Sequence, residues 1–272
     1  MPESIISLTN LRIKHLVKLR THGPKERQGL TIVEGGREIL RAFEAKVPFK
    51  ELYVCREQGE SSIGLEEMGG KESFIKKIAA LKVPVFEVSK SVFAKISYGE
   101  RREGLLALCA PRPLSLEQLH RKENPLYVIV ETVEKPGNLG AILRTADGVG
   151  VDGVIVCDAQ TDIYNPNVIR ASLGTVFCVE VAVTSTRESV RFLKERDIRI
   201  CAAVPCAKNV YSQVNMKGPL AIVLGSEQKG LSDLWASQAD IQVRIPMKGK
   251  ADSLNVSTAA AILLYEALRQ RS

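Results

Sequence analysis

Short apolar runs alternate with helix-forming segments along this chain, and the alternation predicts an α/β protein with two domains. A length of 272 residues is enough for two separate hydrophobic cores. The stretch Pro111-Arg-Pro113, followed by a polar segment, separates two halves that each alternate on their own. We therefore expect a first domain over residues 1–110, a linker over 111–124 and a second domain over 125–272.

The first half predicts a small α/β sandwich of ordinary domain size. It opens with a short basic helix over residues 10–21, in which Leu11, Leu16 and Leu19 should face inward. Further strands are expected at 30–33, 51–55, 83–88 and 104–110, and helices at 37–45, 71–81 and 91–96.

The second half alternates more strongly. Strands are expected at 127–131, 153–157, 177–183, 198–203, 219–224 and 241–245, and helices at 139–149, 167–173, 188–195, 231–237 and 256–269. Apolar strands separated by helices indicate a mostly parallel sheet that is covered on both faces.

Positive charge is concentrated in the first half. The net charge is +7, and residues 1–124 hold 22 Lys and Arg against 16 Asp and Glu, which accounts for +6 of it. No acidic residue lies between Ser4 and Lys25. Such a run suits a polyanion such as nucleic acid, because phosphate contacts supply most non-specific affinity. A solvated helix face explains a single basic run equally well.

Composition excludes several other classes of protein. The first residues lack the basic start and long apolar segment of a signal peptide, and no run approaches the ~20 apolar residues of a membrane helix. The six cysteines form no CxxC pair, and the three histidines build no metal set with them. We expect buried free thiols, no metal, no membrane partner and a cytoplasmic location.

Three loops that follow predicted strands carry the chemistry. They cover residues 134–146, 225–230 and 245–257, and their glycines should let the backbone approach a ligand closely. A dinucleotide site fails on order, because Gly137-Asn-Leu-Gly140 is not GxGxxG. GxxxxGK[ST] is also absent. A nucleotide-dependent oxidoreductase is therefore poorly supported.

Each polar residue of these loops has a plain structural explanation when taken alone. Asn255 would cap the last helix, and Asn138 would stabilise its own turn. Arg144 would form a surface ion pair, and Glu227 would be an exposed loop carboxylate. The combination favours a functional interpretation.

Together the loops closely resemble the three motifs of the SpoU (TrmH-type) branch of the SPOUT RNA methyltransferases. The motifs read Asn138-x-Gly140-x-x-x-Arg144-Thr-Ala, Leu224-Gly-Ser-Glu227-x-x-Gly230 and Ile245-Pro-Met-x-x-x-x-x-Ser-Leu-Asn255-Val-Ser257. The first half is similar, less specifically, to the small L30e-like substrate-binding domain of ribosomal RNA members. The resemblance implies a C-terminal parallel-sheet SPOUT domain with a deep trefoil knot, preceded by an L30e-like α/β domain.

The resemblance also implies an activity and a site. The family transfers the methyl group of S-adenosylmethionine to a ribose 2′-hydroxyl of RNA and works as a homodimer. By matching position, the catalytic candidates are Arg144, Asn138, Glu227 and Asn255. The cofactor candidates are Leu224, Gly225, Ile245, Met247 and Leu254. The candidate RNA contacts are the cations of the basic run, Arg12, Lys14, Lys18, Arg20, Lys25 and Arg27.

Arg144 poses a chemical question. Arginine ordinarily stays protonated up to about pH 12, so it is a poor base. Either its proton is lost unusually easily, or it binds phosphate and orients the hydroxyl while another group takes the proton. The residues leave both alternatives open.

We expect ribosomal RNA of the 23S type as the substrate, because the extra basic domain adds phosphate contacts. Transfer RNA is the second choice. The rival from another class is a non-catalytic RNA-binding or ribosome-assembly protein on the same fold. Its weakness is that a binding module has no need of Asn138, Arg144, Glu227 and Asn255 together.

Overall fold

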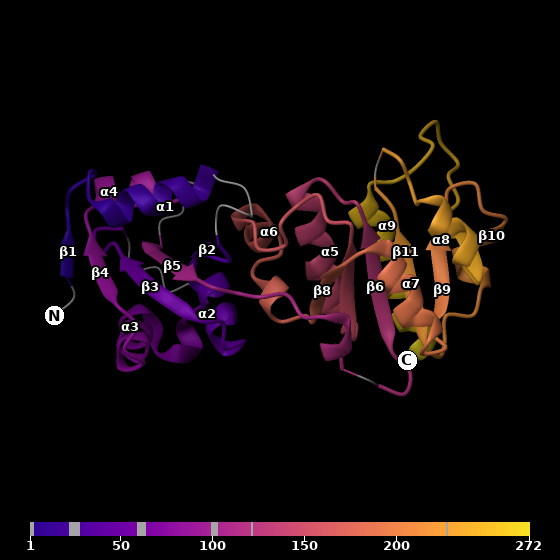
Figure 1. Ribbon diagram of the computed structural model, residues 1–272, viewed down its shortest axis with the longest axis horizontal. Coiled ribbons are helices and arrows are strands. Elements are labelled where there is room, and N and C mark those ends of the chain that lie inside the picture. Colours follow the sequence, from indigo (N-terminus) through magenta and orange to yellow (C-terminus); the bar gives the residue numbers. More distant parts are fainter. Residues whose placement is uncertain (1–2, 22–27, 59–63, 99–102, 121, 227) are drawn as a thin grey trace. The chain divides into compact units, whose positions relative to one another are not determined.

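The computed structural model describes residues 3–21, 28–58, 64–98, 103–120, 122–226 and 228–272. The chain forms two compact units (Figure 1). The N-terminal unit contains residues 1–112 and also residues 164–178, while the C-terminal unit contains 113–163 and 179–272. The expected boundaries thus differ from the spatial units at one segment, 164–178, which lies in the predicted second domain. As domains of separate function, residues 1–110 and 125–272 stay a prediction.

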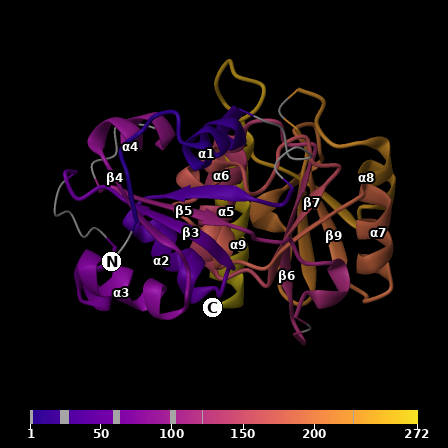
Figure 2. The same cartoon turned by 60° about the vertical axis from the view of Figure 1, so that its left-hand side comes forward.

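The N-terminal unit is a mixed five-stranded sheet with helices on both faces. The strand order is β1-β4-β3-β5-β2, with β5 antiparallel to both of its neighbours. The strands are β1 (Glu3–Ile5), β2 (Thr31–Glu34), β3 (Phe49–Val54), β4 (Val85–Val88) and β5 (Leu105–Cys109). The helices are α1 (Leu11–Thr21), α2 (Gly36–Glu44), α3 (Gly70–Ala80), α4 (Lys90–Ile96) and α6 (Pro166–Ala171). Figures 1 and 2 show α1 and α4 on one face of this sheet and α2 and α3 on the other.

Helix α1 buries two of the three leucines expected to face inward, Leu16 and Leu19, but not Leu11. Ile13, Leu16 and Leu19 are buried in the core beneath it, whereas Leu11 is 81% exposed. Leu11 is the first helical residue, where Asn10 caps the helix by accepting a hydrogen bond from the Arg12 amide at 2.9 Å. The inward stripe starts at Ile13 because residues three apart share a helix face.

Segment 164–178 packs against β2 and α2. The Thr31 hydroxyl donates to the carbonyl of Tyr164 at 2.6 Å, and the Arg41 guanidinium donates to that of Leu173 at 2.6 Å. Gly174 lies so close to Glu38 that an added Cβ would be 2.9 Å from its Cα. This segment is therefore an integral part of the N-terminal unit.

The C-terminal unit is a seven-stranded sheet in which every pair of strands is parallel. Its order is β10-β12-β9-β11-β6-β7-β8. The strands are β6 (Leu126–Glu131), β7 (Gly153–Cys157), β8 (Val181–Thr184), β9 (Arg199–Ala203), β10 (Asn209–Val210), β11 (Leu220–Leu224) and β12 (Ile241–Arg244). The helices are α5 (Pro136–Val149), α7 (Thr186–Lys194), α8 (Asp233–Gln238) and α9 (Val256–Arg271). Helices α5 and α9 pack together on one face, and α7 and α8 on the other.

These findings confirm the predicted α/β class and parallel sheet. One expected strand, at 177–183, begins too early, because residues 175–177 form a turn of 3₁₀ helix and the strand starts at Val181. The ring of Phe177 stacks on Tyr164 within the N-terminal unit, which explains its apolar character without a strand. The trefoil knot stays a prediction.

All six cysteines are free, but only four are buried. Cys178 and Cys206 are exposed, which corrects the expectation that all would be interior thiols. Both lie outside the sheets, Cys178 at the end of the 3₁₀ turn and Cys206 in the loop after β9. Burial raises the pKa of the Cys157 and Cys201 thiols to about 12, which keeps them protonated and unreactive.

Candidate active site

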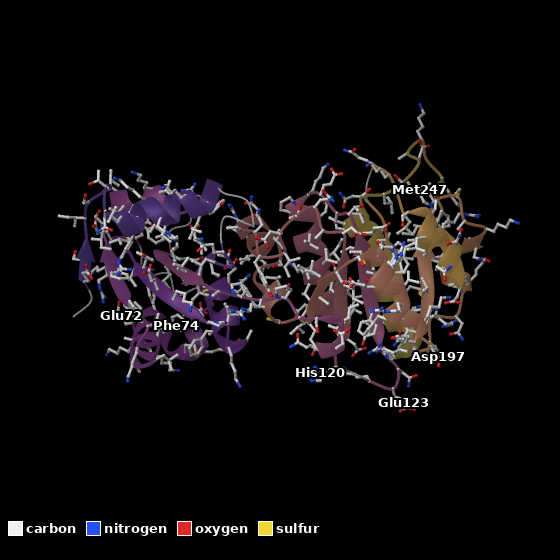
Figure 3. The ribbon with its side chains drawn as sticks, viewed as in Figure 1. Glu72, Phe74, His120, Glu123, Asp197 and Met247 are labelled. Atoms are coloured by element: carbon white, nitrogen blue, oxygen red, sulfur yellow. The ribbon has the colours of Figure 1, made fainter. Side chains whose placement is uncertain are left out.

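The three motif loops all leave the same edge of the parallel sheet. Because β6, β11, β9 and β12 are parallel neighbours, their carboxyl ends lie together. The chain order reverses between β6 and β11, and open α/β sheets bind ligands at such a switch point. Figure 3 shows Met247 at this end of the unit, opposite to His120, Glu123 and Asp197.

The loop that follows β11 closes on itself. The Ser226 amide donates to the Gly230 carbonyl at 3.2 Å, and the Gly230 amide donates to the Ser226 carbonyl at 3.0 Å. The Ser226 hydroxyl also accepts a hydrogen bond from the Lys229 amide at 3.2 Å. A Cβ added to Gly225 would lie 2.1 Å from the carbonyl carbon of Gly230. Loop closure therefore requires glycine at 225, and the close approach of its backbone to a ligand stays a prediction.

A cavity of about 350 Å³ lies between the loops after β9, β11 and β12. All five residues expected to bind the cofactor line it: Leu224, Gly225, Ile245, Met247 and Leu254. Its size lies within the range of small-molecule sites. The cavity thus joins the second and third motifs.

The loop after β9 contributes a wall that the sequence did not indicate. Val204 and Pro205 line the cavity, as do Ser226 and Lys229 of the second motif. Arg244 of β12 fixes this loop by donating to the carbonyls of residues 207 and 208 at 2.6 and 2.9 Å. The contribution of this loop to the cavity follows from the strand order, because β9 lies between β11 and β12.

One side-chain hydrogen bond connects the first motif to the third. The Asn255 amide group donates to the Asn138 side-chain oxygen at 3.1 Å. The Asn255 oxygen also accepts bonds from the amide and the hydroxyl of Ser257, at 2.9 and 2.6 Å, and so caps α9. Capping and linking the motifs are thus performed by the same residue.

Arg144 lies on α5 with its side chain exposed. Within the described residues, neither it nor Asn138 lines the cavity, and no hydrogen bond or ion pair engages the Arg144 guanidinium. The fourth catalytic candidate, Glu227, lies outside the described residues. The arrangement leaves Arg144 available to a substrate from outside.

The basic run of the N-terminal unit divides into two groups. Arg12 pairs with Glu51 and lies over the Phe86 ring at 4.6 Å, and Arg20 lies over the Tyr98 ring at 4.8 Å. Both guanidinium groups thus have partners within the fold. The side chains of Lys14 and Lys18, one turn apart on α1, are exposed. The remaining candidates, Lys25 and Arg27, lie outside the described residues.

The cavity lining fits S-adenosylmethionine chemically. Apolar side chains make up much of the lining, which suits an adenine ring. Among the described lining residues, Lys229 and Arg244 are cationic and Asp252 is anionic. The cofactor carries a cationic sulfonium and ammonium and an anionic carboxylate. Within the parts of the chain that the structure describes, no group of three or more metal-ligating side chains occurs and no helix is long and apolar enough to cross a membrane.

Fold and site together define an α/β enzyme that binds a small ligand at the carboxyl edge of a parallel sheet. Comparison with known protein families identifies the kind of enzyme. The SpoU rRNA methylase family matches residues 125–265, and an MRM3-like substrate-binding domain matches residues 10–107. The chain belongs to the SpoU rRNA methylase family.

Individual relatives extend over nearly the whole chain. The 23S rRNA (guanosine-2′-O-)-methyltransferase RlmB of Bordetella pertussis is 34% identical over 238 residues, which are 86% of this chain and 94% of that protein. The crystal structure of an RNA 2′-O ribose methyltransferase is similar with a TM-score of 0.82 and 38% identity, covering 98% of both chains. An AdoMet-bound rRNA methyltransferase from Sinorhizobium meliloti has a TM-score of 0.87 and 28% identity, covering 98% and 97%.

These comparisons confirm the resemblance that the motifs indicated. The chain is an RNA ribose methyltransferase that uses S-adenosylmethionine as its methyl donor.

Proposed function

We propose that this protein methylates a ribose 2′-hydroxyl of ribosomal RNA of the 23S type, with Arg144, Asn138, Glu227 and Asn255 as its catalytic group. The observation that carries the proposal is the hydrogen bond between Asn255 and Asn138, at 3.1 Å. It joins the motif that contains Arg144 to the motif that supplies part of the cavity lining, so two stretches that are distant in sequence lie together at one edge of the sheet.

The residues of the chain divide the chemical task. S-adenosylmethionine, when bound, supplies a methyl carbon that is open to in-line attack. The proposed cofactor residues Leu224, Gly225, Ile245, Met247 and Leu254 hold it in the cavity. Holding donor and hydroxyl close together provides much of the acceleration in such a displacement. The hydroxyl oxygen gains the carbon, the bond from carbon to sulfur breaks, and the hydroxyl proton leaves.

Arg144 orients the acceptor in this proposal. A guanidinium presents five N–H donors in a planar fork and matches phosphate geometry. The exposed side chain on α5 can therefore bind the phosphate beside the target ribose. A protonated guanidinium has no lone pair for the hydroxyl proton, so another group accepts it.

Ribosomal RNA is the proposed substrate on two grounds. The relative from Bordetella pertussis is named for 23S rRNA and aligns over 86% of this chain. The N-terminal unit, which matches a substrate-binding domain, adds the exposed cations Lys14 and Lys18. A folded RNA that reaches both units would gain phosphate contacts from each.

We propose a homodimer in the cytoplasm as the working state. Arg144 lies outside the cavity of its own chain, so a second subunit can complete the site. Six free cysteines accord with a compartment that keeps thiols reduced.

The decisive experiment is transfer of labelled methyl from S-adenosylmethionine to RNA that lacks modifications. The substrates are total ribosomal RNA, transfer RNA and large ribosomal subunits. Wild type, Arg144→Ala and the control Arg187→Ala, an exposed arginine of α7, are compared. Cofactor affinity is measured for each by calorimetry.

We expect label at one position of ribosomal RNA, where the sugar methyl blocks alkaline cleavage. Arg144→Ala should lose at least a hundredfold in turnover with nearly unchanged cofactor affinity, and Arg187→Ala should lose neither. Equal loss of turnover and cofactor binding in Arg144→Ala would make Arg144 structural. Label in transfer RNA alone would mean that the substrate is transfer RNA instead of ribosomal RNA. Cofactor binding without label in any of the three would favour the non-catalytic RNA-binding protein.

A further inference from the structure

Glu131 is a buried carboxylate at the carboxyl end of the central strand β6. Only 4% of the surface of Glu131 is exposed. Its side chain accepts three hydrogen bonds, from the Thr186 hydroxyl at 2.7 Å, the Ser232 hydroxyl at 2.7 Å and the Ser232 amide at 2.8 Å. In the described portion of the chain no lysine or arginine forms an ion pair with it. Three neutral donors therefore surround this carboxylate.

An interior carboxylate is costly unless it is hydrogen-bonded. Three donors at 2.7–2.8 Å satisfy it and fix where its partners lie. An apolar residue would suit the end of a buried strand if nothing beyond the strand had to be held. The carboxylate thus specifies the positions of Thr186 and Ser232.

Ser232 ends the loop that begins at Gly225 and lines the cofactor cavity. The paired hydrogen bonds between Ser226 and Gly230 join the two sides of this loop, and the Ser226 hydroxyl accepts a further bond from the Lys229 amide. Strand β11 holds its first end, and Glu131 of the neighbouring strand holds its last. Glu131 also directly precedes the loop that leads to Asn138. It therefore lies between the first and second motifs.

We propose that Glu131 is a positioning residue: by holding Ser232, it keeps the neighbouring described lining residues, Gln228, Lys229 and Gly230, in place for S-adenosylmethionine without touching the cofactor. The inference rests on the proposed function and deepens its cofactor site. The hydrogen bond from Thr186 connects the same carboxylate to the start of α7, on the side away from the loop.

The test compares five variants by cofactor affinity, turnover and melting temperature. Glu131→Gln keeps the shape but turns an amide group toward one of the three donors. Ser232→Ala removes one donor on the loop side, and Thr186→Val removes the donor on the α7 side. Glu131→Gln with Ser232→Ala completes a double-mutant cycle. The control Asp152→Asn changes a carboxylate at the opposite end of β6, which accepts from the Leu126 amide at 2.7 Å.

We expect Glu131→Gln to raise the Kd for S-adenosylmethionine about tenfold or more, the effect of losing a hydrogen bond to a charged group. Turnover at saturating cofactor should change less than about threefold. Ser232→Ala should raise the Kd in the same direction, with less than additive effect in the double variant. Thr186→Val and Asp152→Asn should leave the Kd unchanged and lower only the melting temperature.

Two results would overturn the inference. One is an unchanged Kd in Glu131→Gln, with a lower melting temperature alone. The other is a Kd that rises as much in Thr186→Val as in Glu131→Gln, which would assign the effect to the fold around α7. Failure of the proposed function is separate, because there the wild type itself would transfer no methyl group.

Discussion

At the scale of single residues, the loop glycines and the paired asparagines decide how the site is built. Gly225 approaches Gly230 so closely that no side chain fits between them. Gly230 itself has a φ of +67°, in the region that favours glycine. Asn255 combines a helix cap with a contact to Asn138. These two close contacts thus fix the loops that surround the cavity.

Gly225→Ala should weaken cofactor binding while the protein stays folded. Its Cβ would meet backbone atoms of Gly230 at 2.1 Å, so the loop must open. We expect the Kd for S-adenosylmethionine to rise at least tenfold in calorimetry. Gly249→Ala in the next loop is the matched control, because an added Cβ there meets nothing within 4 Å. Equal affinities of the two variants would contradict this account.

The motifs indicate polar candidates for the site, but not the contacts that hold them in place. The spacing within each motif indicates Asn138 and Asn255. It does not indicate their hydrogen bond, because the two residues are 117 positions apart in the sequence. Glu131 escaped notice because a polar residue that ends an apolar strand looks like an ordinary strand end. Its three donors come from α7 and from the loop before α8, which only the fold brings together.

At the scale of elements, α1 carries two arginines that lie over aromatic rings and two lysines whose side chains are exposed. The guanidinium groups of Arg12 and Arg20 lie over the rings of Phe86 and Tyr98, respectively. The Lys14 and Lys18 side chains are exposed on the same helix. The sequence alone does not show this difference, because it depends on the rings of Phe86 in β4 and of Tyr98, which follows α4.

Replacing Lys14 and Lys18 with Ala should weaken RNA binding without changing stability. Each lost phosphate contact lowers the slope of log K against log salt by about 1, so the slope should fall by about 2. Filter binding or anisotropy over a range of salt concentrations measures this. Lys50→Ala with Lys76→Ala removes the same charge from exposed sites elsewhere in this unit. An equal loss of slope in both pairs would mean that only net charge matters.

Most elements lie within a few residues of their predicted positions because apolar runs and helix formers mark them. The exceptions have physical causes. Strands β1 and β10 contain only three and two residues, too few to show alternation. The expected strand at 177–183 included Phe177, whose half-buried ring stacks on Tyr164.

At the scale of the whole molecule, we predict that the homodimer forms through the surface of α5 and α9. Tyr265 of α9 is 53% exposed, and its hydroxyl lies 3.4 Å from the place of a Cβ added to Gly148 of α5. The same helix pair carries Arg144. An exposed ring that lies against the helix of a catalytic candidate fits an interface residue, since aromatic residues are enriched at interfaces.

Sedimentation should give twice the chain mass of 29.8 kDa. Tyr265→Lys should shift the protein toward monomer and lower turnover together, because each site would lose its second subunit. Leu81→Lys, at a leucine of the N-terminal unit that is 63% exposed, should do neither. A monomeric wild type with full turnover would contradict the prediction.

The division of the chain could be predicted only in part. The proline-rich break near residue 112 is visible in sequence, but the apolar residues of α6 would look the same whichever core they joined. The chain therefore passes between its two units three times, after Arg112, Ile163 and Cys178. For domain exchange among relatives this has a direct consequence. A chimaera that received only residues 1–112 would place a foreign β2 and α2 against the native 164–178, so the two stretches must be inherited as a pair.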